Sequence, residues 1–467
     1  MSDRVADQLS QRLNAIIGRL GEYVACQSVS ADPDFEHGME AARCFLERRF
    51  EEIGLNNIQR LDGGGHPAVY ADWLHAPGKP TLIVYGHYDV QPPDPLDEWK
   101  TDPFVLTEKE GRLYGRGASD NKGSSIIALE SLAAYLEVEG GFPFNVRCLF
   151  EGEEEVGAPT LPVIFERYHE LLNGDLVLSA DGGRNGFWPA INVGCRGVTS
   201  MELTLRTSAV RDLHSGRYGG VTRNALHDMA ALLASLHDAD GSVSVEGFLP
   251  ENVLPTEEAR RHVAELGLNE EDLFKSFGGI PHGWPGYSAI ERLMLLPTLE
   301  INGMWGGYTG PGGKTVIPNA GHAKITLRLV PGQVPAAARA AVVRHLEEKA
   351  PVGTSLSISA EAGGAPAYNL GEDSPLVIAA DRVLRAVTGK TPVRVRSGGT
   401  SPITATIRQE LGIDTLMFGF SLPADGVHAP NESYAIQSIR EGIVCWPKML
   451  TELGHIWDCD KNGRTAS

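Results

Sequence analysis

Five short clusters of acidic and histidine residues constrain this chain more than any other feature, because each stands where an apolar run stops. His87, Glu154 and Asp181 come just past the ends of three apolar runs that we predict to be β-strands. Open α/β sheets place their ligand crevice beyond the carboxyl ends of the strands, so these clusters can converge although they lie far apart in sequence. The five clusters are Gly86–Val90, Ala118–Lys122, Glu153–Gly157, Ser179–Gly182 and Gly426–Pro430.

Strand-like and helix-like patterns alternate through the first part of the chain. The predicted strands cover residues 81–85, 145–150 and 175–178, and the predicted helices between them cover residues 121–138 and 160–172. This alternation favours an α/β fold with a mostly parallel sheet that is covered on both faces.

The pattern changes after residue 196. Apolar and polar residues alternate from Met201 to Leu205 and from Ile325 to Leu329, which is typical of antiparallel strands with one exposed face. Helical patterns lie at residues 222–237 and 335–349. We therefore predict that residues 197–362 form an inserted α+β domain, and that residues 1–196 and 363–467 form the two parts of a catalytic, metal-binding domain.

Length and composition exclude several classes of protein. A chain of 467 residues exceeds one ordinary hydrophobic core, so two domains are expected. Its apolar content of 42% and charged content of 22% are those of a soluble globular protein, and we see no signal peptide. The net charge of −19 argues against nucleic acid and anionic membranes as partners. The six scattered cysteines are predicted to be thiols in a reducing cytoplasm.

Each polar cluster allows a simpler structural role when it is taken alone. Asp120 could be a helix N-cap, and His87 could be a histidine packed in the core or exposed on the surface. Glu153–Glu155 could lie in a solvated loop. However, adjacent carboxylates repel one another unless cations neutralise them. Carboxylates and imidazoles are ligands of zinc, manganese and cobalt, and two such ions about 3.5–4 Å apart can catalyse a hydrolysis. Taken together, the clusters predict a two-metal hydrolase.

Four longer motifs stand in order along the chain: Tyr85–Gln91, Gly115–Gly123, Asp212–Gly216 and Gly313–Pro318. They resemble those of a known family, the two-metal metallopeptidases that include carnosinases, cytosolic nonspecific dipeptidases, aminoacylases and glutamate carboxypeptidases. The resemblance runs from about residue 10 to residue 455 and is closest to the dipeptidase and carnosinase branch.

The resemblance implies a ligand set for two ions. His87 and Asp181 would bind one ion, and Glu155 and His428 would bind the other. Asp120 would bridge both ions. The expected cofactors are two divalent ions per chain, zinc first, with manganese or cobalt as alternatives.

The resemblance also implies the catalytic roles. Glu154 would be the general base that takes a proton from a metal-bridging water and later delivers it to the leaving amine. Its place in the glutamate run rests on Gly157, because family members show Glu-Glu-x-Gly, which leaves Glu153 outside the site. Asp89 would orient the histidine ligand two residues before it. In similar proteins the Asp120–Asn121 peptide bond is cis.

The inserted domain resembles the lid of this family, which carries dimerisation and substrate contacts. The resemblance assigns His214 to the oxyanion of the transition state, donated across a homodimer interface. It assigns Arg328 and Thr400 to the carboxylate end of the substrate, and Thr315 to a supporting contact. Alternatively, His214 could be a surface histidine and Arg328 an exposed strand residue, although an arginine fork suits a carboxylate.

These expectations combine into one prediction. The chain should be a cytoplasmic, homodimeric, metal-dependent dipeptidase for dipeptides or short peptides with a free C-terminal carboxylate. An N-acyl-amino-acid deacylase or carboxypeptidase on the same site is the alternative enzyme. A catalytically silent binding protein is disfavoured, because the sequence contains every expected ligand.

Overall fold

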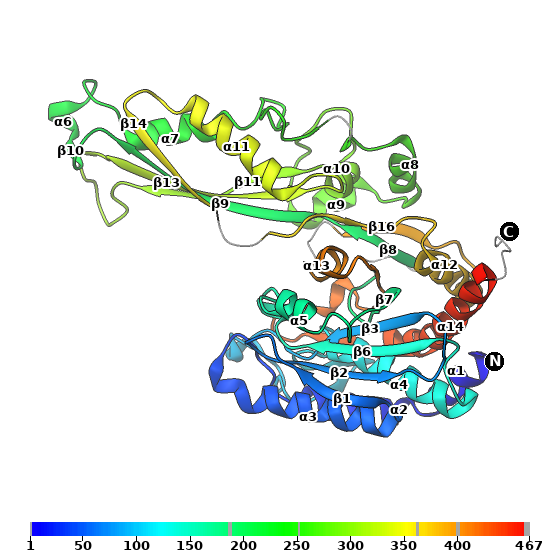
Figure 1. Ribbon diagram of the computed structural model, residues 1–467. Helices are drawn as coiled ribbons and strands as arrows, with labels where there is room; N and C mark the ends of the chain where they lie inside the picture. The colour runs from blue at the N-terminus through cyan, green and yellow to red at the C-terminus, as the bar shows by residue number, and fades with distance from the viewer. Residues whose placement is uncertain (1, 185–188, 251–252, 361–363, 398–401, 462–467) are drawn as a thin grey trace. The chain divides into compact units, whose positions relative to one another are not determined.

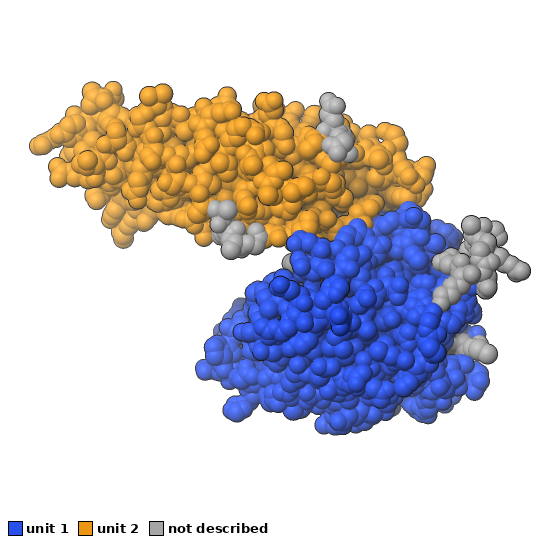
Figure 2. Space-filling view, viewed as in Figure 1, with its two compact units in different colours: residues 1–193, 370–395, 406–467 blue, residues 194–369, 396–405 orange. Residues whose placement is uncertain are grey.

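The computed structural model describes residues 2–184, 189–250, 253–360, 364–397 and 402–461 (Figure 1). The chain forms two compact units, which Figure 2 colours separately. Unit 1 comprises residues 1–193, 370–395 and 406–467, and unit 2 comprises residues 194–369 and 396–405. Unit 2 therefore extends beyond residue 362, where the inserted domain was predicted to end, and also takes in a short later segment.

Unit 1 is built on a mixed sheet with the strand order β1-β2-β6-β3-β7-β17-β8. Strand β3 pairs in parallel with β6 and β7, and β7 pairs in parallel with β17, whereas β1 and β2 add antiparallel pairs at one edge. These strands are β1 (Asn56–Leu61), β2 (Ala68–Trp73), β3 (Thr81–His87), β6 (Asn145–Glu151), β7 (Leu176–Ser179), β8 (Ala190–Cys195) and β17 (Asp414–Met417). The predicted α/β class with a mostly parallel central sheet is confirmed.

Helix α4 (Lys122–Glu139) is buried on nearly every side, because its first turns carry small and apolar residues all round the helix. Helices α1, α2, α3 and α14 pack against α4. The other helices with residues in unit 1 are α1 (Ser2–Gln11), α2 (Leu13–Val24), α3 (Glu36–Ile53), α5 (Leu161–Arg167), α12 (Pro375–Thr388), α13 (Pro402–Leu411) and α14 (Ile436–Lys461). None of the helices in the described ranges is long and apolar enough to cross a bilayer.

A small three-stranded sheet brings two distant loops of unit 1 together. It has the order β18-β5-β4, with β4 (Thr107–Lys109), β5 (Arg112–Tyr114) and β18 (Ser433–Ala435). The loop that follows β5 leads to α4, and the loop that precedes β18 carries His428. The main chain continues this pairing past the strands, because the N–H of Gly115 donates to the carbonyl of Glu432 at 3.0 Å.

Unit 2 contains an antiparallel sheet with the order β11-β13-β9-β14. Its core lies between one face of this sheet and the helices α7 and α11, with Leu203 and Ile325 of the sheet in the same buried cluster as Met229 and Val342 of the helices. The predicted helices at 222–237 and 335–349 are α7 (Ala225–Ala234) and α11 (Pro335–Lys349). The four strands are β9 (Gly197–Thr207), β11 (Thr298–Gly306), β13 (Ala320–Leu329) and β14 (Thr354–Ala360).

Shorter elements complete the described fold. Strands β10 (Leu213–His214) and β12 (Val316–Ile317) form a two-stranded ribbon that leads into α6 (Ser215–Tyr218). The remaining elements are α8 (Glu257–Glu265), α9 (Glu270–Phe277), α10 (Ala289–Leu295), β15 (Tyr368–Asn369) and β16 (Val393–Ser397).

Candidate metal centre

Three predicted ligands meet at the carboxyl edge of the parallel strands in unit 1. His87 is the buried last residue of β3, and its Nε2 lies 3.2 Å from Oδ1 of Asp120. Asp181 stands two residues after β7 and accepts a hydrogen bond from the Asn121 amide at 3.2 Å. One ligand atom from each of these three predicted ligands lies within 4.8 Å of the others. The Asp120–Asn121 peptide bond is cis, as predicted.

A second group of three predicted ligands shares Asp120 with the first. Nε2 of His428 lies 3.1 Å from Oδ2 of Asp120 and 3.0 Å from Oε2 of Glu155. The two oxygens of the Asp120 carboxylate therefore face different imidazoles, Oδ1 facing His87 and Oδ2 facing His428. The structure thus brings all five predicted ligands into two overlapping groups, each with the oxygen and nitrogen donors that a divalent ion accepts.

A buried glutamate that our sequence reasoning missed holds the Asp120 loop in place. Oε1 of Glu432 accepts the N–H groups of Ser119 at 2.9 Å and Asp120 at 3.0 Å. Oε2 accepts a hydrogen bond from Nη1 of Arg116 at 2.7 Å and from the N–H of Gly117 at 3.0 Å. The only sequence signal for this residue is a carboxylate four positions after a predicted ligand. Its role follows from the fold, because only the β18-β5 pairing brings it to this loop.

Asp89 contacts both halves of the predicted site. Nδ1 of His87 lies 3.1 Å from the main-chain oxygen of Asp89 and 3.4 Å from its Oδ1. Because both of these neighbours are acceptors, Nδ1 carries a hydrogen, and Nε2 is the nitrogen that faces Asp120. The Asp89 carboxylate also accepts the main-chain N–H groups of Glu154 at 3.3 Å and Glu155 at 3.1 Å.

Burial and crowding shift the pKa values of these groups. Burial raises the pKa of Glu154 well above its usual value, and the neighbouring Asp181 charge adds to the increase against the opposing effect of His87. Burial also raises the pKa of Asp181 to about 6. Hydrogen bonds to Asp120 and Glu155 raise the pKa of His428 to about 10. These shifts reflect a surplus of buried negative charge, which a divalent cation would neutralise.

A cavity of about 420 Å³ opens directly beside the cluster. Its walls include Asp120 and Asp181, the glycines Gly182 and Gly183, and apolar side chains from the loop at 421–427. This volume lies within the range of small-molecule sites in proteins. The cavity is therefore large enough for a small substrate at the metal centre.

Two predicted substrate residues lie together in the ribbon of unit 2. His214 is exposed at the end of β10, and its Nδ1 accepts the N–H of Gly216 at 3.0 Å. The cross-strand partner of His214 is Val316, and Thr315 comes one residue before it, with its carbonyl accepting the N–H of Ser215 at 3.1 Å. The Gly216 contact also sets the tautomer of the neutral imidazole, since Nδ1 accepts and Nε2 must therefore carry the hydrogen.

The third predicted substrate residue lies away from the ribbon, on strand β13 of the four-stranded sheet. Arg328 is half-buried on β13, eight residues after the first residue of that strand, Ala320. At about 3.3 Å per residue, roughly 26 Å separates Arg328 from the end of β13 that leads to the ribbon. Figure 1 shows β10 and α6 beyond that end of unit 2. The structure therefore does not bring Arg328 and His214 together within one chain, and Thr400 lies outside the described residues.

A second arginine that our sequence reasoning missed lies close to Arg328. Arg196 is only 5% exposed, and its guanidinium donates to the carbonyl of Leu293. Burial and, to a smaller extent, the positive charge of Arg328 lower the pKa of Arg196 to about 10. A single arginine before a strand carries no spacing signal, so only the fold reveals this pair of cations.

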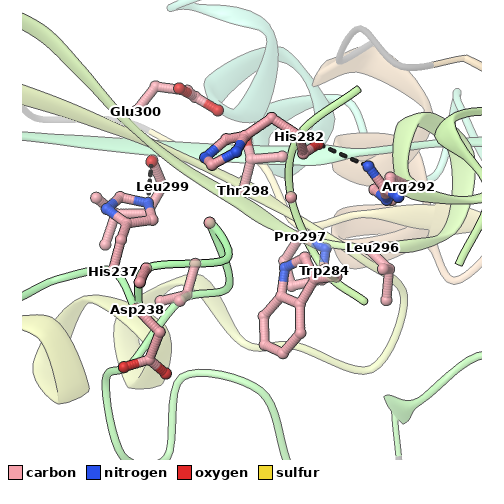
Figure 3. A pocket seen from close by; sticks show the side chains of 14 residues that line it. His237, Asp238, His282, Trp284, Arg292, Leu296, Pro297, Thr298, Leu299 and Glu300 are labelled. Atoms are coloured by element: carbon pink, nitrogen blue, oxygen red, sulfur yellow. Dashed lines mark hydrogen bonds between the residues drawn. The ribbon is translucent and has the colours of Figure 1, made fainter. Parts of the chain in front are cut away.

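Unit 2 has a cavity of its own, of about 380 Å³ (Figure 3). His237, His282, Trp284 and Glu300 contribute side chains to its lining. The ring of His237 contacts the carbonyl of Leu299 at 3.0 Å. The lining includes none of the predicted site residues.

Comparison with known proteins places these features in a family. The sequence model of "Peptidase family M20/M25/M40" matches residues 83–452. The "Beta-Ala-His dipeptidase" of Homo sapiens is 30% identical, over 97% of this chain and 93% of that protein. The structure of the di-peptidase Dug1p from Saccharomyces cerevisiae is similar, with a TM-score of 0.78, 25% identity, and coverage of 97% of this chain and 99% of that one. An M20 family metallo-carboxypeptidase, Sso-CP2 from Sulfolobus solfataricus, gives a TM-score of 0.80 at 30% identity, over 94% and 99% of the two chains.

Proposed function

The chain belongs to peptidase family M20/M25/M40, as its motifs predicted, and we propose that its metal centre hydrolyses the single peptide bond of dipeptides. The protein is a metal-dependent peptidase, and relatives named as dipeptidases cover nearly its whole length. The observation that carries the proposal is the pair of ligand groups that share Asp120. We further propose that unit 1 is the catalytic domain and that unit 2 is the lid.

The donor atoms fit two divalent ions. His87, Asp181 and one oxygen of Asp120 would hold the first ion, and Glu155, His428 and the other oxygen of Asp120 would hold the second. A mixed carboxylate and imidazole set suits zinc, with manganese or cobalt as alternatives. When bound, the ions supply positive charge that lowers the pKa of the attacking water and polarises the scissile carbonyl.

Glu154 is placed to move the proton. It begins the short turn after β6, next to the ligand Glu155, but it belongs to neither ligand group. Its carboxylate takes the proton of the attacking water and delivers it to the leaving amine. Asp89 supports this role, because it accepts the main-chain N–H of Glu154 and so holds the turn against the end of β3.

The substrate residues of unit 2 support a homodimer in which each active site uses residues from both chains. A dipeptide is far shorter than the roughly 26 Å that separates Arg328 from the ribbon end of β13, so Arg328 and His214 of one chain cannot grip the same substrate. His214 would reach the partner's site and donate its Nε2 hydrogen to the developing oxyanion, and Thr315 beside it would support the contact. A two-fold axis would repeat the exchange in both sites.

Strand β11 offers a surface for the second copy. It is an edge strand of the unit 2 sheet, and it exposes apolar side chains at Ile301 (42%), Met304 (50%) and Trp305 (41%). An exposed edge with large apolar side chains is a site for pairing with another strand. A second copy of this chain could cover it.

We also propose a reducing, cytoplasmic location. All six cysteines are free thiols, and Cys44 and Cys459 are exposed. Exposed free thiols persist in a reducing compartment and are oxidised outside it.

Chelation is expected to abolish the release of free amino acids from a dipeptide, and adding back zinc, manganese or cobalt should restore it. The same assay should show that N-acetylation of the dipeptide abolishes cleavage, since a dipeptidase requires a free amine. Chromatography of the released amino acids measures both effects. Activity that survives complete metal removal would contradict the proposal, and preferred cleavage of the N-acetylated form would favour a deacylase or carboxypeptidase.

Amidating the C-terminus of a dipeptide should lower kcat/KM by an amount equivalent to about 2–5 kcal/mol, because it leaves the guanidinium of Arg328 without its carboxylate. In an Arg328→Met variant the free acid and the amide should be cleaved with similar efficiency, since the charged donor is gone. Comparing kcat/KM for both substrates on both enzymes isolates the contact. Equal efficiency of the wild type on acid and amide would rule out this role for Arg328.

A further inference from the structure

Two loops of the metal centre are joined through one short segment, Asp89–Gln91. The carboxylate of Asp89 accepts the main-chain N–H groups of Glu154 and Glu155. The side-chain amide of Gln91 donates to the main-chain oxygen of Glu155 and to its Oε2, each at 3.0 Å. The proposed function explains Asp89 through His87, but it leaves Gln91 without a role.

Gln91 restrains Glu155 at both ends of its side chain. One amide nitrogen reaches the main chain and the carboxylate of the same residue, so the side chain cannot turn away without breaking a hydrogen bond. The carboxylate is almost fully buried, with 3% of the side chain exposed. An unrestrained glutamate would lose rotamer freedom on binding an ion, and this restraint removes part of that entropy cost.

The restraint matters most when an ion is bound. Oε2 of Glu155 faces both Gln91 and Nε2 of His428, each at 3.0 Å. An imidazole that ligates an ion through Nε2 has no hydrogen on that nitrogen, so His428 can then no longer donate to Oε2. Gln91 is then the remaining side-chain donor to this carboxylate among the residues that the structure describes.

We propose that Gln91 is a positioning residue that sets the affinity of the second ion, the one held by Glu155 and His428. The inference rests on the two-ion function proposed above. The first group is positioned by other residues: Asp89 contacts His87, and Asn121 contacts Asp181. Loss of the Gln91 amide should therefore lower the affinity of the second ion site and leave the affinity of the first unchanged.

The test is a titration of metal-free protein with Zn²⁺ in competition with a chromophoric chelator, together with a count of bound ions. In Gln91→Met, which keeps the side-chain length but lacks the donor, the first binding step should be unchanged. The second step should be about 10–100-fold weaker, the usual effect of removing a partner that orients a ligand. Gln91→Asn, whose amide is one carbon too short, should weaken the same step.

Gln59→Met is the matched control. Gln59 is exposed on β1, and among the described residues its side-chain amide donates to the main-chain oxygen of Asn57 at 3.4 Å and to no predicted ligand, so this variant should bind both ions as the wild type does. The inference would be overturned if both binding steps of Gln91→Met kept the wild-type affinity. It would also be overturned if both steps were weakened equally, because that result indicates a general structural role. If the wild type itself binds fewer than two ions at saturation, the proposed two-ion function fails instead.

Discussion

Glu154→Gln should lower the turnover of a dipeptide by about 10²–10⁴-fold and leave both ions bound, because an amide cannot accept the proton that a positioned base must carry. Gln has nearly the same shape as Glu, and the main-chain N–H that holds the turn to Asp89 is untouched. Glu154 belongs to neither ligand group, so the metal content should stay at two ions per chain. Steady-state kinetics and elemental analysis of the same preparation measure the two quantities.

The neighbouring glutamates supply controls with the same chemical change. Glu155→Gln should lose one ion per chain, because Glu155 completes the group with Asp120 and His428. Glu153→Gln should keep both ions and most of the activity, since the Glu153 carboxylate accepts the N–H of His66 at 3.2 Å and contacts no predicted ligand. Loss of metal from Glu154→Gln, or full activity in that variant, would show that the roles of base and metal ligand are wrongly assigned among these glutamates.

Mixed dimers of His214→Ala and Glu154→Ala chains should regain activity although each variant alone is nearly inactive. If His214 acts in the partner's site, a mixed dimer has one site with both residues intact. Random pairing makes about half of the dimers mixed, each with one repaired site of two, so the ceiling is about a quarter of wild-type activity. Co-expression of the two chains and an activity assay of the mixture measures the rescue.

Differentially tagged chains sharpen this test. Tandem purification yields only mixed dimers, in which the expected activity is about half that of the wild type. A Glu154→Ala chain paired with a chain that carries both substitutions is the control, because neither of its sites contains both residues. An inactive mixed dimer would mean that His214 acts within its own chain, in spite of its separation from Arg328 along β13.

The fold class and the family could be predicted from the sequence because their signals are local. Apolar runs such as Thr81–Tyr85 and Asn145–Phe150 form strands β3 and β6, and parallel pairing brings their ends to one edge of the sheet. The ligand motifs follow those ends directly, so predicting the strands also predicts which residues can meet. The metal-dependent peptidase family followed from the same motifs, which the family match over residues 83–452 confirms.

Contacts made across loops could not be predicted in this way. Glu432 holds the Asp120 loop through four hydrogen bonds, yet in the sequence it is one acidic residue among many. Gln91 stands inside a recognised motif, but its contact with Glu155 spans 64 residues. Such contacts depend on how close two remote chain segments lie in the fold, and no periodicity within either segment encodes the distance between them.

The family, the α/β class and the residue types that can hold two ions could all be predicted from the sequence, because each depends on short patterns of neighbouring residues. The tertiary structure was needed to show that the two oxygens of Asp120 face different histidines, and that Arg328 on β13 lies far from the β10–β12 ribbon that carries His214. Strand pairing fixes the distances between residues that are remote in the chain, and no short sequence pattern contains those distances. A motif identifies the candidate side chains, and the register of the strands sets the distances that decide which of them can contact one substrate.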